Sequence, residues 1–196
     1  MVNIFVALDR SGSMSGERWT SAIDSINDYI ANLQKEEVEG NVTIIAFDSN
    51  MQGHVRLESI LENRSIAYFK RVNPDVLAPS GMTPLYDAAA YIMDLALKSE
   101  SERAVVVIMT DGHENASREY TQTTIKSKVD SVTKKGYEVI FLGANFDISQ
   151  YTAQAGLAAG KMRSFDLSNM NARMAMSSDL ATSTVAYAST GKGIEL

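Results

Sequence analysis

The sequence predicts an α/β protein with three layers, in which a mostly parallel six-stranded sheet of order 3-2-1-4-5-6 lies between helices on both faces. Short apolar runs rich in valine and isoleucine recur with little alternation, which is typical of strands covered on both faces. Amphipathic helical patterns separate these runs. One alternating segment follows a strand directly, across a turn, and adds an antiparallel strand at an edge. Such an order of elements predicts a doubly wound, Rossmann-like sheet.

Four apolar runs are predicted to form the buried strands, because their frequent β-branched side chains favour extended backbone. The alternating edge strand is predicted at Gln52–Glu58, after the turn-like Asp48-Ser49-Asn50. A further short strand is expected at Lys161–Phe165. The four buried runs are Ile4–Leu8, Val42–Phe47, Ala104–Met109 and Val139–Leu142.

Helices are predicted from apolar residues that recur at helical spacing. The first stripe runs from Trp19 to Leu33, and Gly40 is expected to stop that helix. The second runs from Leu85 to Ala96, with Thr83 at its N-cap and Pro84 in its first turn. Further helices are expected at residues 118–135, 148–157 and 168–188, whereas residues 60–82 show no clear pattern.

Length and composition limit the domain organisation and the function classes. A chain of 196 residues is compatible with one domain over residues 1–196, with a core at about 1–190 and a frayed tail from Gly191. The net charge of −6 opposes binding to nucleic acid or an anionic membrane. The absence of cysteine excludes disulfides and thiolate sites, and fits the cytoplasm. We also expect neither a signal peptide nor a membrane-spanning segment.

Two acidic residues are predicted to meet at one edge of the sheet. Asp9 ends the first strand within the pattern Asp9-Arg-Ser11-Gly-Ser13, and Asp111 directly follows the strand 104–110. In doubly wound sheets, ligands bind beyond the carboxyl ends of strands, where the strand order reverses. In the predicted order the two strands are neighbours, about 4.8 Å apart, so the two carboxylates face each other.

The repulsion between these carboxylates is relieved either when one of them takes up a proton or when a cation neutralises both. Ser11, Ser13 and a threonine at a helix start supply hard, neutral oxygen atoms, which suit Mg²⁺ or Mn²⁺. No imidazole or thiolate stands beside them to favour zinc.

Three motifs together resemble those of the von Willebrand factor type A domain, in order and separation along essentially the whole chain: Asp9-x-Ser11-x-Ser13, Gly81-Met-Thr83-Pro-Leu and Thr110-Asp111-Gly112. The resemblance implies a metal-ion-dependent adhesion site that binds Mg²⁺, or Mn²⁺ or Ca²⁺, through five residues. Residues 110–120 and 141–145 are especially similar to compact stand-alone bacterial and phage members. The five implied ligands are Asp9, Ser11, Ser13, Thr83 and Asp111.

The residues next to the implied ligands are candidates for a rim that contacts a partner. Met14 and Met82 each adjoin a ligand and would offer an adaptable apolar surface. His113 and Glu114 follow Asp111 by two and three positions. These four residues are therefore the candidates for a partner-binding rim around the ion.

The resemblance favours a non-enzymatic binding module, an adaptor or scaffold, whose ion is completed by an aspartate or glutamate of a protein partner. Some stand-alone prokaryotic members of the family are found beside P-loop ATPase chaperones, so such a chaperone is one candidate partner.

Two other functions remain open from the sequence. The first is a Mg²⁺-dependent phosphohydrolase or phosphotransferase with Asp9 as phosphoryl acceptor. Enzymes of this kind have the pattern Asp-x-Asp at the end of the first strand. This chain has Ser11 in place of the second aspartate. The second is nucleotide binding, although the glycines of segments 12–16 and 156–162 do not have the spacing of the known nucleotide motifs.

Overall fold

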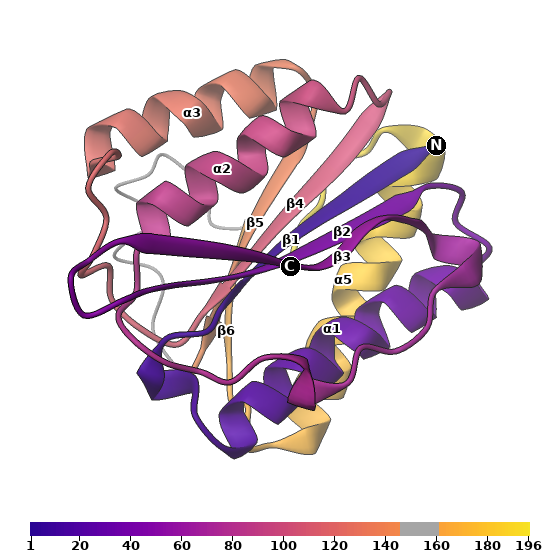
Figure 1. The fold of residues 1–196 in the computed structure, drawn as a ribbon. Coiled ribbons are helices and arrows are strands. Elements are labelled where there is room, and N and C mark those ends of the chain that lie inside the picture. The colour runs from indigo at the N-terminus through magenta and orange to yellow at the C-terminus, as the bar shows by residue number, and fades with distance from the viewer. Residues whose placement is uncertain (146–160) are drawn as a thin grey trace.

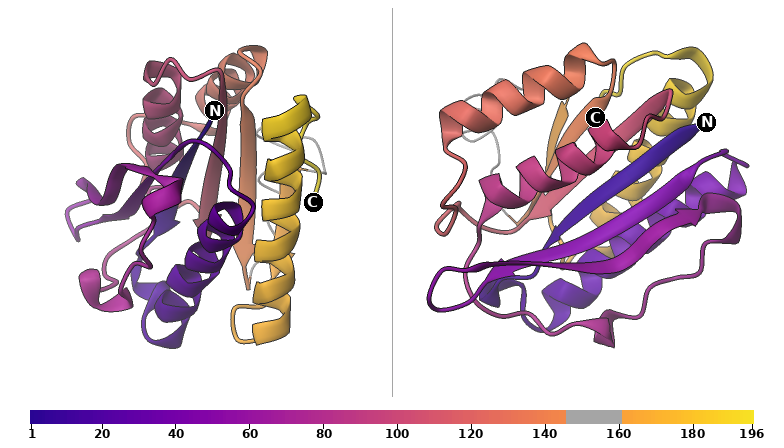
Figure 2. Two further views of the ribbon diagram at one scale, coloured as in Figure 1. Left: turned by 90° about the vertical axis from the view of Figure 1, so that its right-hand side faces the viewer. Right: turned by 45° about the horizontal axis from the view of Figure 1, so that its top comes forward.

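The computed structural model describes residues 1–145 and 161–196, which form a sheet between two layers of helices. Helices α2 and α3 cover one face, and α1 and α5 cover the other (Figures 1 and 2). The strands are β1 (Val2–Asp9), β2 (Asn41–Ser49), β3 (Val55–Ser65), β4 (Arg103–Thr110), β5 (Glu138–Ala144) and β6 (Met162–Phe165). The helices are α1 (Glu17–Lys35), α2 (Leu85–Lys98), α3 (Gln122–Lys134) and α5 (Met170–Thr190), with short 3-10 turns at Gly12–Met14, Ile66–Tyr68 and Pro74–Val76.

The sheet has six strands in the order β3-β2-β1-β4-β5-β6, which confirms the predicted fold class. All neighbouring pairs are parallel except β2 and β3. The order reverses between β1 and β4, where Leu8 lies opposite Met109. Asp9 and Asp111 therefore leave the sheet at neighbouring points of the same edge.

The central strands are buried on both faces, which explains their continuous apolar runs. In β4, Val105 and Val107 pack toward α1 and α5, whereas Val106 and Ile108 pack toward α2 and α3. All four side chains are fully buried. Burial of each such side chain contributes about 1.5–3 kcal/mol to the stability of the fold, so the loop after β4 leaves from a well-packed strand.

Helix α1 ends earlier than predicted, at Lys35, and Glu37 rather than Gly40 takes the left-handed backbone conformation (φ 53°). Gly40 has a different role, because a Cβ atom there would lie 1.7 Å from the carbonyl oxygen of Val2. The glycine is thus required for the close approach of two backbone segments, which the sequence pattern could not distinguish from a helix stop.

The predicted helix at residues 118–135 begins later, at Gln122. The carboxylate of Asp87 accepts hydrogen bonds from the backbone N–H groups of Arg118 and Tyr120, both at 2.8 Å, and so holds this segment out of the helix. Thr121 then caps the helix in a reciprocal capping box with Thr124.

The edge strand β3 begins three residues after its predicted start and continues to Ser65, beyond the predicted end at Glu58. Its pairing with β2 is irregular around Ile44, and Asn63 has φ 44°. These irregularities hide the alternation that a regular half-buried strand would show. The remainder of segment 60–82 contains the two 3-10 turns at Ile66–Tyr68 and Pro74–Val76.

The tail after Gly191 is packed rather than frayed. Ile194 is fully buried, and its backbone N–H donates to Glu138 Oε2 at 3.2 Å. Strand β6 and helix α5 lie within two residues of their predicted bounds. The helix predicted near residues 148–157 falls outside the described residues. Within the part of the chain that the structure describes, no helix is long and apolar enough to cross a membrane.

Gly81 is predicted to be essential for the loop that precedes α2. Its φ is 72°, and a Cβ atom there would lie 1.7 Å from the carbonyl oxygen of Ser49. Gly136 has a similar φ of 84°, but a Cβ atom there would meet nothing within 4 Å. We expect Gly136→Ala to cost about 1 kcal/mol and Gly81→Ala to cost roughly 3 kcal/mol or more, since only the second substitution adds a clash. Urea denaturation measures both, and equal costs would contradict the role of Gly81.

Candidate metal-binding site

The polar residues singled out in the sequence gather at the carboxyl edge of the sheet. Asp9 is the last residue of β1, and Asp111 directly follows β4, the neighbouring strand. The 3-10 turn at Gly12–Met14 carries Ser13, and Thr83 lies two residues before α2. The backbone N–H of Gly12 donates to the carbonyl oxygen of Gly81 at 3.0 Å and joins two of these loops.

Asp9 is fully buried, and both of its carboxylate oxygens accept hydrogen bonds. Oδ1 accepts from the backbone N–H of Ser11 at 2.7 Å, and Oδ2 accepts from the Thr110 hydroxyl at 2.6 Å. The sequence analysis included Thr110 only as part of the motif Thr110-Asp111-Gly112 and gave it no role in the site. Its hydrogen bond fixes the carboxylate between β1 and β4.

A chain of hydrogen bonds connects the two serines to Asp111. The hydroxyl oxygens of Ser11 and Ser13 lie 3.0 Å apart, and the Ser13 hydroxyl donates to Asp111 Oδ1 at 2.6 Å. Arg18, in the first turn of α1, donates from Nη1 to Asp111 Oδ2 at 3.1 Å. The structure thus brings Asp9, Ser11, Ser13 and Asp111 together, and it adds Arg18, which the sequence did not indicate.

Thr83 lies beside this chain. Its position differs by one residue from the prediction, because Pro84 occupies the N-cap of α2 and no side chain caps the helix. Thr83 is 3% exposed, and its hydroxyl has no hydrogen-bond partner among the residues that the structure describes. A Cβ atom on Gly112 would lie 3.8 Å from Thr83 Oγ1 and 3.9 Å from Ser13 Oγ, so the two hydroxyls flank the same glycine.

The electrostatics of the site centre on Asp9. Burial raises the pKa of its carboxyl group from 3.8 to about 6, although the hydrogen bonds from Thr110 and Ser11 favour the ionised form. The nearby charge of Asp111 raises the pKa further, as a smaller effect. The folded protein therefore holds a carboxylate that lacks full compensation at neutral pH, and a bound cation would supply it.

The donor set fits a hard divalent cation. Across residues 1–145 and 161–196, no group of three or more His, Asp or Glu side chains is arranged to hold a metal ion. The site therefore depends on two carboxylates and the hydroxyl groups of Ser11, Ser13 and Thr83. All of these donors are oxygen atoms, which Mg²⁺, Mn²⁺ and Ca²⁺ prefer.

The four expected rim residues have different environments. Met14 is fully buried in the core beneath α1, so its side chain does not form part of an exposed rim. Met82 is half-buried, and its backbone pairs with Ser49. His113 is exposed. Glu114 turns toward the protein, and its carboxylate accepts hydrogen bonds from the backbone N–H groups of Tyr86 at 2.9 Å and Ser117 at 2.6 Å.

The loop after β4 is fastened to the start of α2. Asn115 Oδ1 accepts from the backbone N–H of Thr83 at 2.8 Å, and the backbone N–H of Asn115 donates to the carbonyl oxygen of Thr83 at 3.1 Å. Together with the contacts of Glu114, these bonds fix the position of the loop that carries Asp111 relative to Thr83. Glu114 and Asn115 thus position the candidate ligands.

An ion-pair network centred on the buried pair Arg10–Asp48 supports the other side of the site, and the sequence did not reveal it. Arg10 is 4% exposed and donates to Asp48 at 3.0 Å and to Glu58 at 2.9 Å. Arg56 also binds Asp48, at 2.6 Å, and donates to Ser80 Oγ at 2.7 Å. Because the backbone N–H of Ser80 donates to the carbonyl oxygen of Arg10, the network ties the loop before Thr83 to the end of β1.

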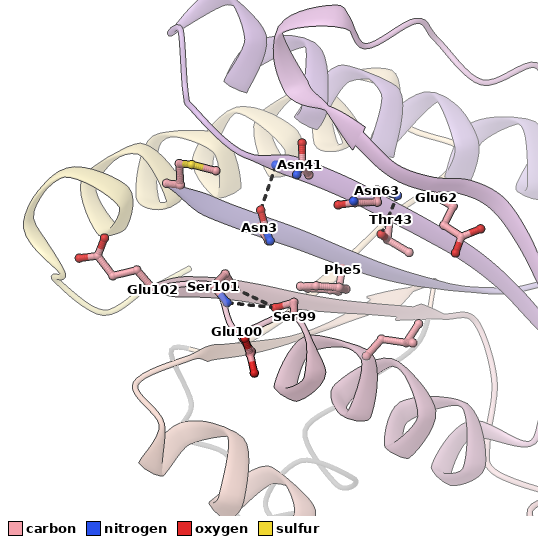
Figure 3. Close-up of a pocket in the computed structure, with 12 residues that line it drawn as sticks. Asn3, Phe5, Asn41, Thr43, Glu62, Asn63, Ser99, Glu100, Ser101 and Glu102 are labelled. Atoms are coloured by element: carbon pink, nitrogen blue, oxygen red, sulfur yellow. Dashed lines mark hydrogen bonds between the residues drawn. The ribbon is translucent and has the colours of Figure 1, made fainter.

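A groove of about 650 Å³ lies at the opposite, amino edge of the sheet (Figure 3). Several polar side chains that line it bind neighbouring backbone. Asn3 Oδ1 accepts from the N–H of Asn41, and Thr43 Oγ1 accepts from the N–H of Asn63, both at 3.1 Å. None of the candidate metal ligands lines this groove.

Comparison with known proteins identifies the family of the chain. Residues 3–180 match the family model of the von Willebrand factor type A domain. Because this match covers most of the sequence, the chain belongs to the von Willebrand factor type A domain family. No curated protein matches the sequence.

Several solved structures share the fold. Proximal thread matrix protein 1 from the mussel byssus has a TM-score of 0.69 at 13% identity, over 94% of this chain and 48% of that protein. Manganese-loaded TRAP from Plasmodium vivax has a TM-score of 0.61 at 16% identity, over 90% and 71% of the two chains. The pilus adhesin SpaC from Lactobacillus rhamnosus GG has a TM-score of 0.69 at 14% identity, over 92% of this chain and 29% of that protein. The chain spans about half the length of the mussel protein, and at these identities the likeness shows the fold alone.

The raised pKa of Asp9 predicts a pH-dependent stability in the absence of divalent ions. Between about pH 4 and pH 6 the folded protein retains the Asp9 proton, which the unfolded chain has already lost. The free energy of unfolding should therefore decrease as the pH rises through this window, by up to about 3 kcal/mol. Urea denaturation of the wild type and Asp9→Asn in the presence of a chelator isolates this effect, since the variant has no carboxyl group there. A difference between the two proteins that does not change with pH would refute it.

Proposed function

We propose that this protein is a divalent-metal-dependent protein-binding module, an adaptor or scaffold without catalytic activity. The observation that carries the proposal is the convergence of two carboxylates with the hydroxyls of Ser11, Ser13 and Thr83 at the edge where the strand order reverses. The Thr83 hydroxyl has no hydrogen-bond partner among the described residues and is available to a ligand.

The chemistry of this donor set favours an incomplete coordination shell. Hydroxyl oxygens carry no formal charge, so an ion bound by two carboxylates and three hydroxyls remains electrophilic. When bound, the ion would accept a further oxygen ligand from an aspartate or glutamate of a partner. The residues that would hold it are Asp9, Ser11, Ser13, Thr83 and Asp111.

The partner is proposed to be a protein that presents an acidic side chain. The net charge of −6 disfavours nucleic acid and anionic membranes. We further propose that the chain is of the compact bacterial or phage type, that it acts in the cytoplasm, that Mg²⁺ is its usual ion, and that a P-loop ATPase chaperone is one candidate partner. Half-buried Met82 and exposed His113 are the best placed of the expected rim residues to contact such a partner.

A phosphohydrolase that uses Asp9 as nucleophile is the alternative, and the residue two positions after Asp9 disfavours it. Ser11 occupies the position where such an enzyme carries a second carboxylate as acid and base. Asp9-dependent release of phosphate from a generic phosphate ester would support the enzyme instead.

Divalent ions are predicted to stabilise the fold. If Mg²⁺ binds with a dissociation constant of about 1 mM, then about 10 mM Mg²⁺ adds roughly 1.4 kcal/mol and raises the melting temperature by about 3–6 °C. Asp9→Ala and Thr83→Ala should abolish or weaken this increase. Thr121→Ala is the matched control, because it removes a helix cap far along the chain and should keep the increase. A wild-type melting curve indifferent to Mg²⁺, Mn²⁺, Ca²⁺ and chelator would argue against the site.

The binding function is predicted to depend on the ion and on Asp9 together. Affinity capture with the wild type in Mg²⁺ should retain partners that are lost in chelator. The same partners should be lost with Asp9→Ala in Mg²⁺, because the variant lacks one of the two charged ligands. Thr121→Ala again serves as the folded control. Capture that is unaffected by both chelator and Asp9→Ala would place the binding surface elsewhere.

A further inference from the structure

Arg18 places a positive charge at the mouth of the candidate metal site. Its Nη1 atom donates to Asp111 Oδ2 at 3.1 Å and to the carbonyl oxygen of Ser13 at 3.2 Å. The Arg18 side chain is 50% exposed, whereas the Asp111 side chain is 0% exposed. The guanidinium group thus covers a buried carboxylate from the solvent side and contacts two of the three segments that carry the candidate ligands.

The position of Arg18 in its helix is not explained by helix formation. Gly16, with φ 75°, turns the chain into α1, and Arg18 is the second residue of the helix. A basic side chain in a first turn lies at the positive end of the helix dipole, which costs about 0.3–1 kcal/mol at an exposed site. The contact of Arg18 with Asp111, and not the helix dipole, is therefore the interaction that favours a positive charge at this position.

The two oxygen atoms of the Asp111 carboxylate have different hydrogen-bond partners, a hydroxyl group and a guanidinium group. Oδ1 accepts from the Ser13 hydroxyl at 2.6 Å, and Oδ2 accepts from Arg18. A hydroxyl that donates to Oδ1 keeps its own lone pairs available for a cation, so Ser13 need not be displaced. The guanidinium group, in contrast, carries a full positive charge 3.1 Å from Asp111 Oδ2, an oxygen atom of one of the candidate ligands.

We propose that Arg18 is an internal counter-ion of the candidate metal site, which neutralises Asp111 when no ion is present and competes with a divalent cation for it. This inference rests on the proposed function, because it concerns the same site. In this role, which none of the five implied ligands has, Arg18 lowers the affinity of the site for the ion and stabilises the metal-free protein.

The test is a calorimetric titration of Mn²⁺ alone into the wild type and three variants at pH 7.5. Arg18→Ala should bind Mn²⁺ on the order of tenfold more tightly than the wild type, because a unit charge beside a dication is removed. Arg18→Lys keeps the charge and should stay within about threefold of the wild type. Arg71→Ala is the matched control, since Arg71 is 51% exposed and pairs with Asp24 and Asp28, about 9–15 Å further along α1. It should bind as the wild type does.

Thermal melting provides the second measurement. In chelator, Arg18→Ala should melt below the wild type, because Asp111 has lost its counter-ion. In saturating Mn²⁺ this difference should shrink or reverse, since the ion then neutralises the carboxylate. The tighter binding and the metal-free destabilisation must occur together, which distinguishes competition from a general loss of structure.

The outcomes separate this inference from the proposed function. If the wild type binds Mn²⁺ and Arg18→Ala binds it equally or more weakly, Arg18 is not a competitor, and the proposed function stands without it. If Arg18→Ala binds Mn²⁺ and the wild type does so only weakly, the inference is supported. If none of the four proteins binds Mn²⁺, the proposed function is wrong, and the inference falls with it.

Discussion

The burial of the Asp9 carboxylate at the end of a central strand is the constraint on which the rest of the site depends. A carboxylate at 0% exposure loses its hydration, and the fold compensates with hydrogen bonds from the Ser11 backbone and the Thr110 hydroxyl. The first of these bonds shapes the turn that carries Ser13, and the second joins β1 to β4. The geometry of the whole edge therefore follows from the way in which this one charge is accommodated.

The architecture could be predicted from the sequence because the central strands are covered on both faces. Their apolar runs are continuous, and the strand order follows from the alternation of strands and helices. The ends of elements were predicted less well. Gly40 resembled a helix stop but serves a close approach to Val2, and Asp87 holds residues 118–120 out of the helix that their pattern suggests. In both cases a contact between distant segments overrides the local signal.

The candidate ligands could be inferred because their positions at strand ends carry information that their residue types alone do not. The residues that support them could not. Thr110 and Asp9 are 101 positions apart, and Arg18 and Asp111 are 93 positions apart, so no local pattern connects them. For Met14 the sequence predicted too much. Because it adjoins a candidate ligand it was expected at an exposed rim, whereas its side chain is buried in the core. Proximity along the chain does not specify the direction of a side chain.

The fastening of the loop after β4 to the start of α2 has a mechanical consequence. Asn115 binds Thr83, and Glu114 binds the backbone of Tyr86. Helix α2 in turn packs on the central strands through Ala88, Ala89 and Ile92. A pull on Asp111 would therefore be shared by two attachments, the central strand β4 that directly precedes it and helix α2, which packs on the sheet.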